Sequence, residues 1–103
     1  MVTIFSGTWD VILDTPIGKM EVVFEITEVD GVIGGIARSD AETVEIVDAV
    51  ADGSRLTWVQ TVTTPMRLTL KFDVTVDGDT MTGTSKAGIL PTSKVNGSRV
   101  TGG

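Results

Sequence analysis

The sequence predicts an all-β protein, an eight-stranded antiparallel up-and-down barrel formed by a single domain over residues 1–103. Three observations predict it. Valine, isoleucine and threonine are abundant while alanine and leucine are scarce, a composition that favours strands. Several runs alternate apolar and polar residues, and pairs of Asp or Asn with Gly separate them. A chain of 103 residues is long enough to bury one core and fold alone.

The clearest alternating run is MRLTLKFDVTV, which begins at residue 66. Because successive side chains of a strand point to opposite faces, its apolar residues share one face. These residues are Met66, Leu68, Leu70, Phe72, Val74 and Val76. The same period of two runs through residues 9–13, 20–26 and 56–62. Each run therefore has one face suited to a core and one suited to water.

Four dipeptides indicate tight hairpin turns, since Asp, Asn and Gly tolerate the positive φ that such turns need. They are Asp30-Gly31, Asp52-Gly53, Asp77-Gly78 and Asn96-Gly97. Short turns make neighbouring strands antiparallel. The predicted strands cover residues 5–14, 19–29, 32–38, 43–50, 55–63, 66–76, 80–87 and 94–101.

The segment SDAETVEIVDAVADG, from residue 39, allows two interpretations. Ser39 followed three residues later by Glu42 resembles a capping box, and Gly53 would end a helix. Five β-branched residues between positions 43 and 50 favour a strand instead. We expect a strand, with a helix as the alternative.

The two halves of the chain resemble each other. Trp9 precedes Pro16 by seven residues, as Trp58 precedes Pro65. FEITEVDGVIGG in the first half matches FDVTVDGDTMTG in the second, and DGSRLT matches NGSRVT. We interpret this as an internal repeat of 44 to 49 residues, each copy giving four strands. Joining the copies edge to edge would close a barrel and leave no free strand edge, although a second chain could supply the partner in a homodimer.

Composition excludes several classes of function. The net charge of -6 disfavours binding to nucleic acid and to anionic membranes. The chain contains no histidine, cysteine or tyrosine, so the usual nitrogen ligand of zinc, copper and haem and the imidazole base are missing, and we expect no metal and no cofactor. Absence of cysteine and of a basic, apolar leader favours a cytoplasmic protein.

A first-strand Gly7-Thr8-Trp9 and a last-strand Gly97-Ser98-Arg99 together resemble the calycin superfamily, which includes lipocalins, fatty-acid-binding proteins and avidins. The resemblance implies that Arg99 packs over Trp9 and closes one end of the barrel. It also implies an interior that can hold a small molecule. The chain lacks the N-terminal helix of lipocalins, the helical lid of fatty-acid-binding proteins and the histidine of haem-binding members.

An eight-stranded barrel either is filled by its own side chains or holds one small ligand. The residues that we predict to line such an interior are Met20, Phe24, Trp58, Gln60, Met66, Phe72 and Met81. Methionine adapts to varied apolar shapes, and Gln60 would orient a ligand by hydrogen bonding. The alternatives are ordinary core packing, and for Gln60 a buried water or Ser85 as its partner. Gly35 and Gly83 hold equivalent places in the two halves and are expected to allow strand bends.

Three functions remain open. The first is a barrel that binds a small apolar or amphipathic molecule. The second is a non-metal enzyme of proton-transfer or cyclisation type, with Glu28 as its acid or base. The third is a filled barrel that self-associates, for which Ile89 and Leu90 would supply apolar contacts.

Overall fold

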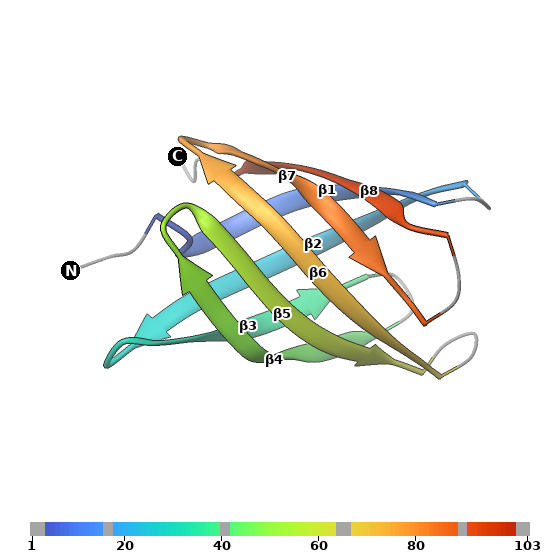
Figure 1. The fold of residues 1–103 in the computed structure, drawn as a ribbon, viewed down its shortest axis with the longest axis horizontal. Helices are drawn as coiled ribbons and strands as arrows, with labels where there is room; N and C mark the ends of the chain where they lie inside the picture. The colour runs from blue at the N-terminus through green and yellow to red at the C-terminus, as the bar shows by residue number, and fades with distance from the viewer. Residues whose placement is uncertain (1–3, 16–17, 40–41, 64–66, 89–90, 101–103) are drawn as a thin grey trace.

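The computed structural model describes residues 4–15, 18–39, 42–63, 67–88 and 91–100. They form an all-β, eight-stranded antiparallel barrel, as the sequence predicts (Figure 1). The strands are β1 (Gly7–Thr15), β2 (Gly18–Val29), β3 (Val32–Arg38), β4 (Thr43–Asp52), β5 (Arg55–Val62), β6 (Leu68–Asp77), β7 (Thr80–Lys86) and β8 (Ser93–Arg99).

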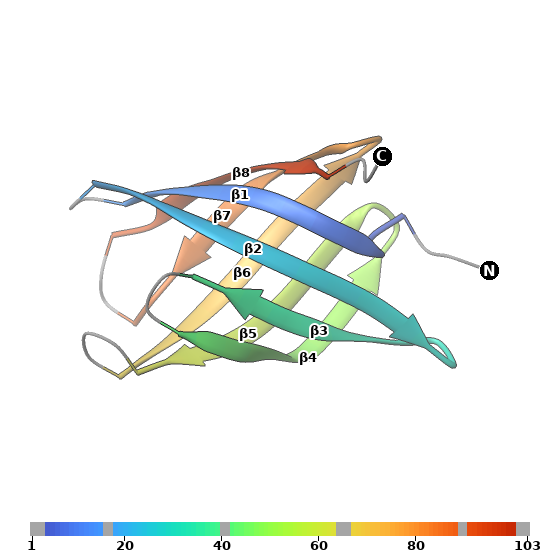
Figure 2. The same cartoon turned by 180° about the vertical axis from the view of Figure 1, so that it is seen from behind.

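Closure of the barrel depends on the pairing of its first and last strands. Each strand pairs antiparallel with the next, and β1 also pairs with β8 in a register that runs from Trp9 opposite Arg99 to Asp14 opposite Lys94. Figure 2 shows these two strands side by side. No strand edge is left over, so the up-and-down barrel needs no second chain to complete it.

The two ends of the barrel differ in how they connect strands. At one end, here called the turn end, hairpins at Asp30-Gly31, Gly53-Ser54 and Gly78-Asp79 join the strands. Asp30 and Gly31 both have positive φ, 53° and 80°, as the tightest hairpins require. At the other, here called the loop end, β1, β3, β5 and β7 finish. The turn end lies at the left of Figure 1.

The prediction of a turn at Asn96-Gly97 is wrong. Both residues lie inside β8, where Gly97 faces Val11 of β1 and Met81 of β7. A Cβ at Gly97 would come within 2.9 Å of a methyl group of Val11. The glycine therefore serves close packing between strands and not chain reversal.

The ambiguous segment is a strand. Residues 43–52 form β4, so the helical alternative is wrong. Asp48, with φ of 53°, forms a β-bulge at which the β4–β5 register shifts between Val47 and Val50. Because the bulge reverses the alternation, Val47 and Val50 both face outward, and they are 43% and 60% exposed.

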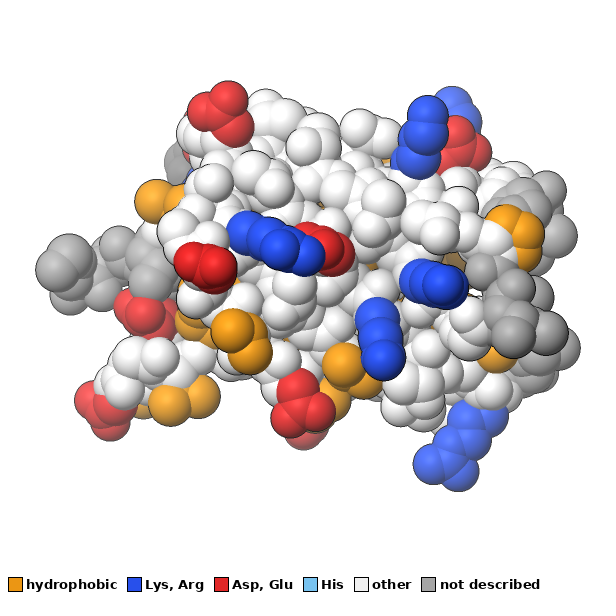
Figure 3. Space-filling view, viewed as in Figure 1, with side chains coloured by type: hydrophobic (Ala, Val, Ile, Leu, Met, Phe, Trp, Pro, Cys, Tyr) orange, Lys and Arg blue, Asp and Glu red, His pale blue; other side chains and the backbone are white. Residues whose placement is uncertain are grey.

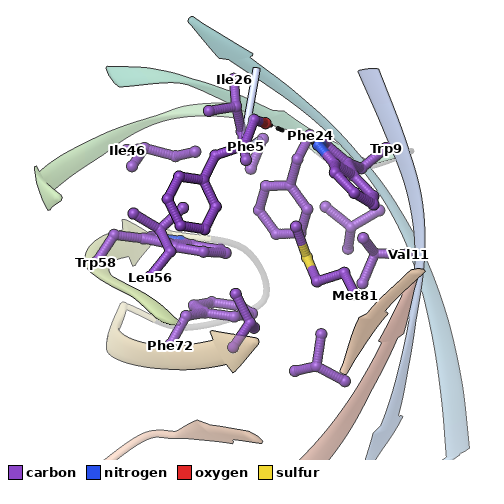
Figure 4. Close-up of a cluster of buried hydrophobic side chains, with 14 of the residues drawn as sticks. Phe5, Trp9, Val11, Phe24, Ile26, Ile46, Leu56, Trp58, Phe72 and Met81 are labelled. Atoms are coloured by element: carbon purple, nitrogen blue, oxygen red, sulfur yellow. Dashed lines mark hydrogen bonds between the residues drawn. The ribbon is translucent and has the colours of Figure 1, made fainter. Parts of the chain in front are cut away.

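In each half of the chain, a buried tryptophan faces a buried phenylalanine of the next strand. Trp9 of β1 faces Phe24 of β2, and Trp58 of β5 faces Phe72 of β6. All four side chains are at most 1% exposed and belong to one cluster of buried apolar residues (Figure 4). The internal repeat itself stays a prediction from the sequence.

Candidate functional site

The turn end is sealed by the segment before β1. Phe5 is 2% exposed and joins the core cluster, and its carbonyl accepts a hydrogen bond of 2.9 Å from Trp9 Nε1 (Figure 4). The predicted first strand began at residue 5, whereas β1 begins at Gly7 and Phe5 lies in a turn. Phe5 precedes Trp9 by four residues, and in an extended chain an even spacing puts two side chains on the same face. This spacing was the sequence signal that Phe5 faces inward.

Arg99 holds this segment in place. Its guanidinium lies 4.4 Å from the centre of the Trp9 ring, donates to the carbonyls of Ile4 and Ser6, and pairs with Asp79 at 2.9 Å. A cation over an indole face is attracted by the ring quadrupole. Trp9 and Arg99 therefore come together at the turn end, in the arrangement that the calycin resemblance implies.

The middle of the barrel is filled with aromatic rings. Phe24 meets Trp58 and Phe72 edge to face, with ring centres 5.2 and 5.6 Å apart. Trp58 and Phe72 stack at 4.9 Å with 8° between their planes. Met81 is fully buried in the same cluster. These four predicted wall residues therefore pack on one another and on the core.

Gln60 lies one layer nearer the loop end than Trp58. Its side chain is 3% exposed, and its Oε1 accepts a hydrogen bond of 3.0 Å from Trp58 Nε1. Among the described residues its amide nitrogen has no hydrogen-bond partner in the protein. No fully enclosed polar side-chain atom of the described residues lacks a partner, so this nitrogen must border some space that a water molecule could occupy.

Two serines lie on β7 and β8, the strands that follow β6 around the barrel. Ser85 of β7 faces Phe72 on one side and Ser93 of β8 on the other, and all three share the inner face. Ser85 is 5% exposed, and within the part of the chain described here its hydroxyl makes no hydrogen bond to protein. By the argument used for Gln60, it too reaches accessible space. Sequence reasoning had named Ser85 only as a partner for Gln60 and had missed Ser93.

Apolar side chains lie next to Gln60 on the inner face at the loop end. Leu70 faces Gln60 directly, and Leu68 faces Val62 one layer further out. Leu70, Leu68 and Val62 are half-buried although they point inward, and so is Val44 of β4. We define the loop-end site as the inward-facing residues Val44, Gln60, Val62, Leu68, Leu70, Ser85 and Ser93.

One of the predicted methionine walls, Met20, lies at the rim of the barrel, and another, Met66, lies outside the described residues. Met20 faces Leu13 on the inner side of β2, but it lies at the rim of the loop end and is 45% exposed. The alternation therefore gave the inward face of Met20 correctly but not its depth, and its role in lining a ligand site stays a prediction. Met66 lies outside the described residues, as do Ile89 and Leu90.

Glu28 lies at the opposite end of the molecule from Gln60. It faces Ile33 beside the hairpin at Asp30-Gly31 and is half-buried. Glu28 is the penultimate residue of β2 and so lies at the turn end, and the carboxylate does not belong to the loop-end site.

Two hollows bordered by described residues lie on the outer wall. One, of about 300 Å³, is bordered by Asp48, Thr57 and Lys71 at the bulge of β4. The other, of about 550 Å³, is an open depression beside Gly34 and Gly35. Neither has the set of His, Cys or carboxylate groups that would hold a metal ion, and no such group occurs elsewhere in the described ranges.

One carboxyl group on the outer wall has a shifted pKa. Arg55 donates two hydrogen bonds to Asp73, which lies on β6 two residues from Thr75, the residue opposite Arg55. These bonds stabilise the carboxylate and hold the pKa of Asp73 below its ordinary value, while they raise the pKa of Arg55. Both side chains are exposed, so the pair contributes to the outer surface and not to the loop-end site.

No family model matches the sequence, and neither does any curated protein. Among the residues that the structure describes, none forms a helix that could span a membrane.

Proposed function

We propose that the loop-end site binds a small amphipathic molecule. The observation that carries this proposal is a pair of buried polar groups, the Gln60 amide nitrogen and the Ser85 hydroxyl, that reach accessible space without a protein partner. A buried polar group that lacks a hydrogen bond is unfavourable, so such groups are normally satisfied by water or by a ligand.

The residues around the two groups suit the apolar part of such a ligand. Val62, Leu68 and Leu70 present half-exposed apolar surface at the same end of the barrel. A site of mostly apolar lining with a few convergent polar groups is typical of small-molecule binding. A ligand carbonyl or hydroxyl would accept from Gln60 and exchange a hydrogen bond with Ser85.

The aromatic layer limits the depth of the site. Phe24, Trp58 and Phe72 are each at most 1% exposed and touch one another. A ligand would therefore rest on this layer at the loop end and would not fill the barrel. Together with the end sealed by Trp9 and Arg99, this arrangement supports a calycin-like binding protein with a shallow site.

Calorimetric titration with 1-octanol tests the proposal. We expect saturable binding by the unmodified protein and a loss of roughly three- to tenfold in affinity in Ser85→Ala, the effect of one hydrogen bond. Thr84→Ala is the matched control, because Thr84 is the exposed, outward-facing neighbour of Ser85 on β7. Its affinity should equal that of the unmodified protein.

The Gln60→Leu variant tests the proposed site independently of Ser85. If the amide binds ligand, the variant loses affinity for octanol. If the variant is more stable than the unmodified protein and binds octanol with unchanged affinity, Gln60 is only a core residue and the proposed site is wrong. Absence of any saturable binding of octanol by the unmodified protein would equally overturn it.

A further inference from the structure

We infer that the turn-end part of the β3–β4 junction is a docking edge for an extended basic peptide, which would add to the barrel wall as an extra strand. The inference is independent of the loop-end site, because it concerns the opposite end of the barrel. It starts from two neighbouring strands that part before they reach the turn end.

Every strand of the barrel has two partners, but β3 and β4 are paired over only part of their length. Their ladder joins four residues of each strand and stops at Gly35 opposite Ile46. Residues 32–34 of β3 and 47–52 of β4 lie beyond this point and are not paired with each other. Figure 1 shows the two strands diverging toward the turn end. We call these two segments the split edges.

The bulge at Asp48 accounts for the divergence. It comes two residues after Ile46, the last residue of β4 in the ladder, and a bulge bends its strand and increases the local twist. On the other side of the junction, Gly34 has no atom within 4 Å of an added Cβ. The open depression beside Gly34 and Gly35 also touches Ile46, so it lies where the ladder stops.

Backbone groups of the split edges are directed toward the junction. The β2–β3 hairpin bonds Val29 to Val32, so the next residue, Ile33, turns its N–H and C=O away from β2. Asp52 likewise begins the hairpin to β5, so Ala51 turns its backbone groups away from β5. Outside the strand ladders, no backbone hydrogen bond of the described residues involves Ile33 or Ala51. Such an edge is a template for pairing with another chain.

Exposed valines flank both split edges on the outer face. Val29 and Val32 face each other across the β2–β3 hairpin and are 65% and 70% exposed. Val47 and Val50 lie on the outer face of β4, beyond the last pair of the ladder. Apolar side chains grouped in this way on a surface indicate an interaction site. An added strand would cover them with its own side chains on the same face.

Carboxylates without basic partners lie around the split edges. The arginines of this region are already paired, Arg38 with Glu25 and Arg55 with Asp73. Among the described residues, five further carboxylates near the split edges form no ion pair: Glu28, Asp30, Glu45, Asp48 and Asp52. In Figure 3, orange and red side chains gather at the lower left, where the β2–β3 hairpin ends. The surface therefore complements a cationic partner.

Glu28 indicates how the basic residues of the partner would be spaced. It faces Ile33 on the inner side of the barrel wall, whereas Val32 lies on the outer side. Because successive side chains of a strand point to opposite faces, an added strand would place every second residue inward, toward Glu28, and the others outward, beside the valines. The partner that fits is an extended segment in which basic and apolar residues alternate.

The same charges disfavour a second copy of this chain as the occupant. Each copy has a net charge of -6 and would bring the same carboxylates to the junction. Like charges brought together across an interface oppose association. A basic peptide satisfies the free backbone groups, the valines and the carboxylates together.

Titration of the full chain with the synthetic peptide acetyl-KVKVKVK-amide, followed by ¹⁵N-correlated NMR, tests the inference. Acetyl-EVEVEVE-amide reverses the charge of the peptide. Acetyl-KVKPKVK-amide keeps the charge, but its proline lacks a backbone N–H and interrupts strand pairing. The protein variants are Val50→Lys, at the split edge, and the matched control Thr84→Lys, at an exposed outward position of β7. Both variants change the net charge equally.

We expect saturable binding of the alternating lysine peptide, with slower hydrogen exchange at the amides of Ile33 and Ala51. The proline peptide should bind roughly tenfold more weakly, and the glutamate peptide should not bind. Val50→Lys should bind the lysine peptide roughly three- to fivefold more weakly than the unmodified protein does, because it adds a like charge beside it. Thr84→Lys should keep the affinity of the unmodified protein.

Three results would overturn the inference, and none of them bears on the binding of octanol at the loop end. The first is no saturable binding of the lysine peptide. The second is equal affinity for the lysine and proline peptides, or an equal loss in both variants, which would mean that charge alone attracts the peptide. The third is a mass near twice 10.8 kDa by light scattering that Val50→Lys abolishes, which would make a second copy the occupant.

Discussion

Arg99, the last residue of β8, covers the indole of Trp9 at a distance of 4.4 Å from guanidinium to ring centre. The two residues also face each other in the β1–β8 register that closes the barrel. The guanidinium thus joins the last strand, the first strand and the segment before it. One side chain links the closure of the sheet to the sealing of the turn end.

Replacement of Arg99 by alanine should destabilise the protein by about 2 to 4 kcal/mol. The change removes the cation–π contact, the bonds to the carbonyls of Ile4 and Ser6, and the pair with Asp79. Urea unfolding followed by circular dichroism measures the difference. Arg99→Lys keeps the charge but loses the planar guanidinium with its several donors, so its stability should lie between that of the unmodified protein and that of Arg99→Ala. A loss in Arg99→Ala below about 0.5 kcal/mol would show that the contact contributes little.

Phe5→Ala should cost about 3 to 5 kcal/mol, because a fully buried aromatic ring is lost from the core. The carbonyl that accepts from Trp9 is part of the backbone and is retained. Ile4→Ala is the matched control, since Ile4 is 49% exposed and its change should stay within about 0.5 kcal/mol. Equal unfolding midpoints in urea for the two variants would contradict the role assigned to Phe5.

Neighbouring glycines of β3 should respond very differently to alanine. A Cβ at Gly35 would lie 2.0 Å from the carbonyl oxygen of Glu25, and the residue has φ of 148°. The clash is with backbone, so Gly35→Ala should cost at least about 3 kcal/mol. Gly34 has no atom within 4 Å of such a Cβ, and Gly34→Ala should change stability by less than about 1 kcal/mol. Thermal unfolding compares the two, and similar melting temperatures would refute the close approach of β2 and β3.

The Arg55–Asp73 pair should make a contribution to stability that depends on pH. Arg55 lowers the pKa of Asp73 in the folded state below its unfolded value of about 3.9. The contribution is therefore complete above that value and is lost as the pH falls through the lower, folded pKa. In urea melts, Arg55→Gln should be slightly less stable than the unmodified protein at pH 7, and the difference should shrink as the pH falls through the folded pKa of Asp73. A difference that persists at acid pH would mean that the pair does not act through the charge of Asp73.

Much of the fold could be predicted because its determinants are local. Alternation fixed the inward face of residues such as Phe72, and three of the four predicted turns lie where strands reverse. The bulge at Asp48 could not be read this way, since one residue with positive φ shifts the face of all that follow. The burial of Asn96-Gly97 in β8 likewise depends on contacts with β1 and β7.

The candidate site was harder to predict, because depth in a barrel is a tertiary property. Met20 has the inward face that the pattern indicated, yet it lies at the rim. Gln60 was identified as an inward polar residue, but its bond to Trp58, two residues away on the same strand, depends on the aromatic packing. Ser93 becomes relevant only through its register opposite Ser85.

The two tryptophans give the most direct test of a ligand site at the loop end. Trp58 Nε1 donates to Gln60, whereas Trp9 Nε1 donates to Phe5 at the opposite end. The chain has two tryptophans, so a ¹⁵N-correlated NMR spectrum contains one indole signal for each. During titration with 1-octanol we expect the Trp58 indole signal to shift progressively and the Trp9 signal to stay in place. A shift of the Trp9 signal alone, or no shift of either at saturating octanol, would contradict binding at the loop end.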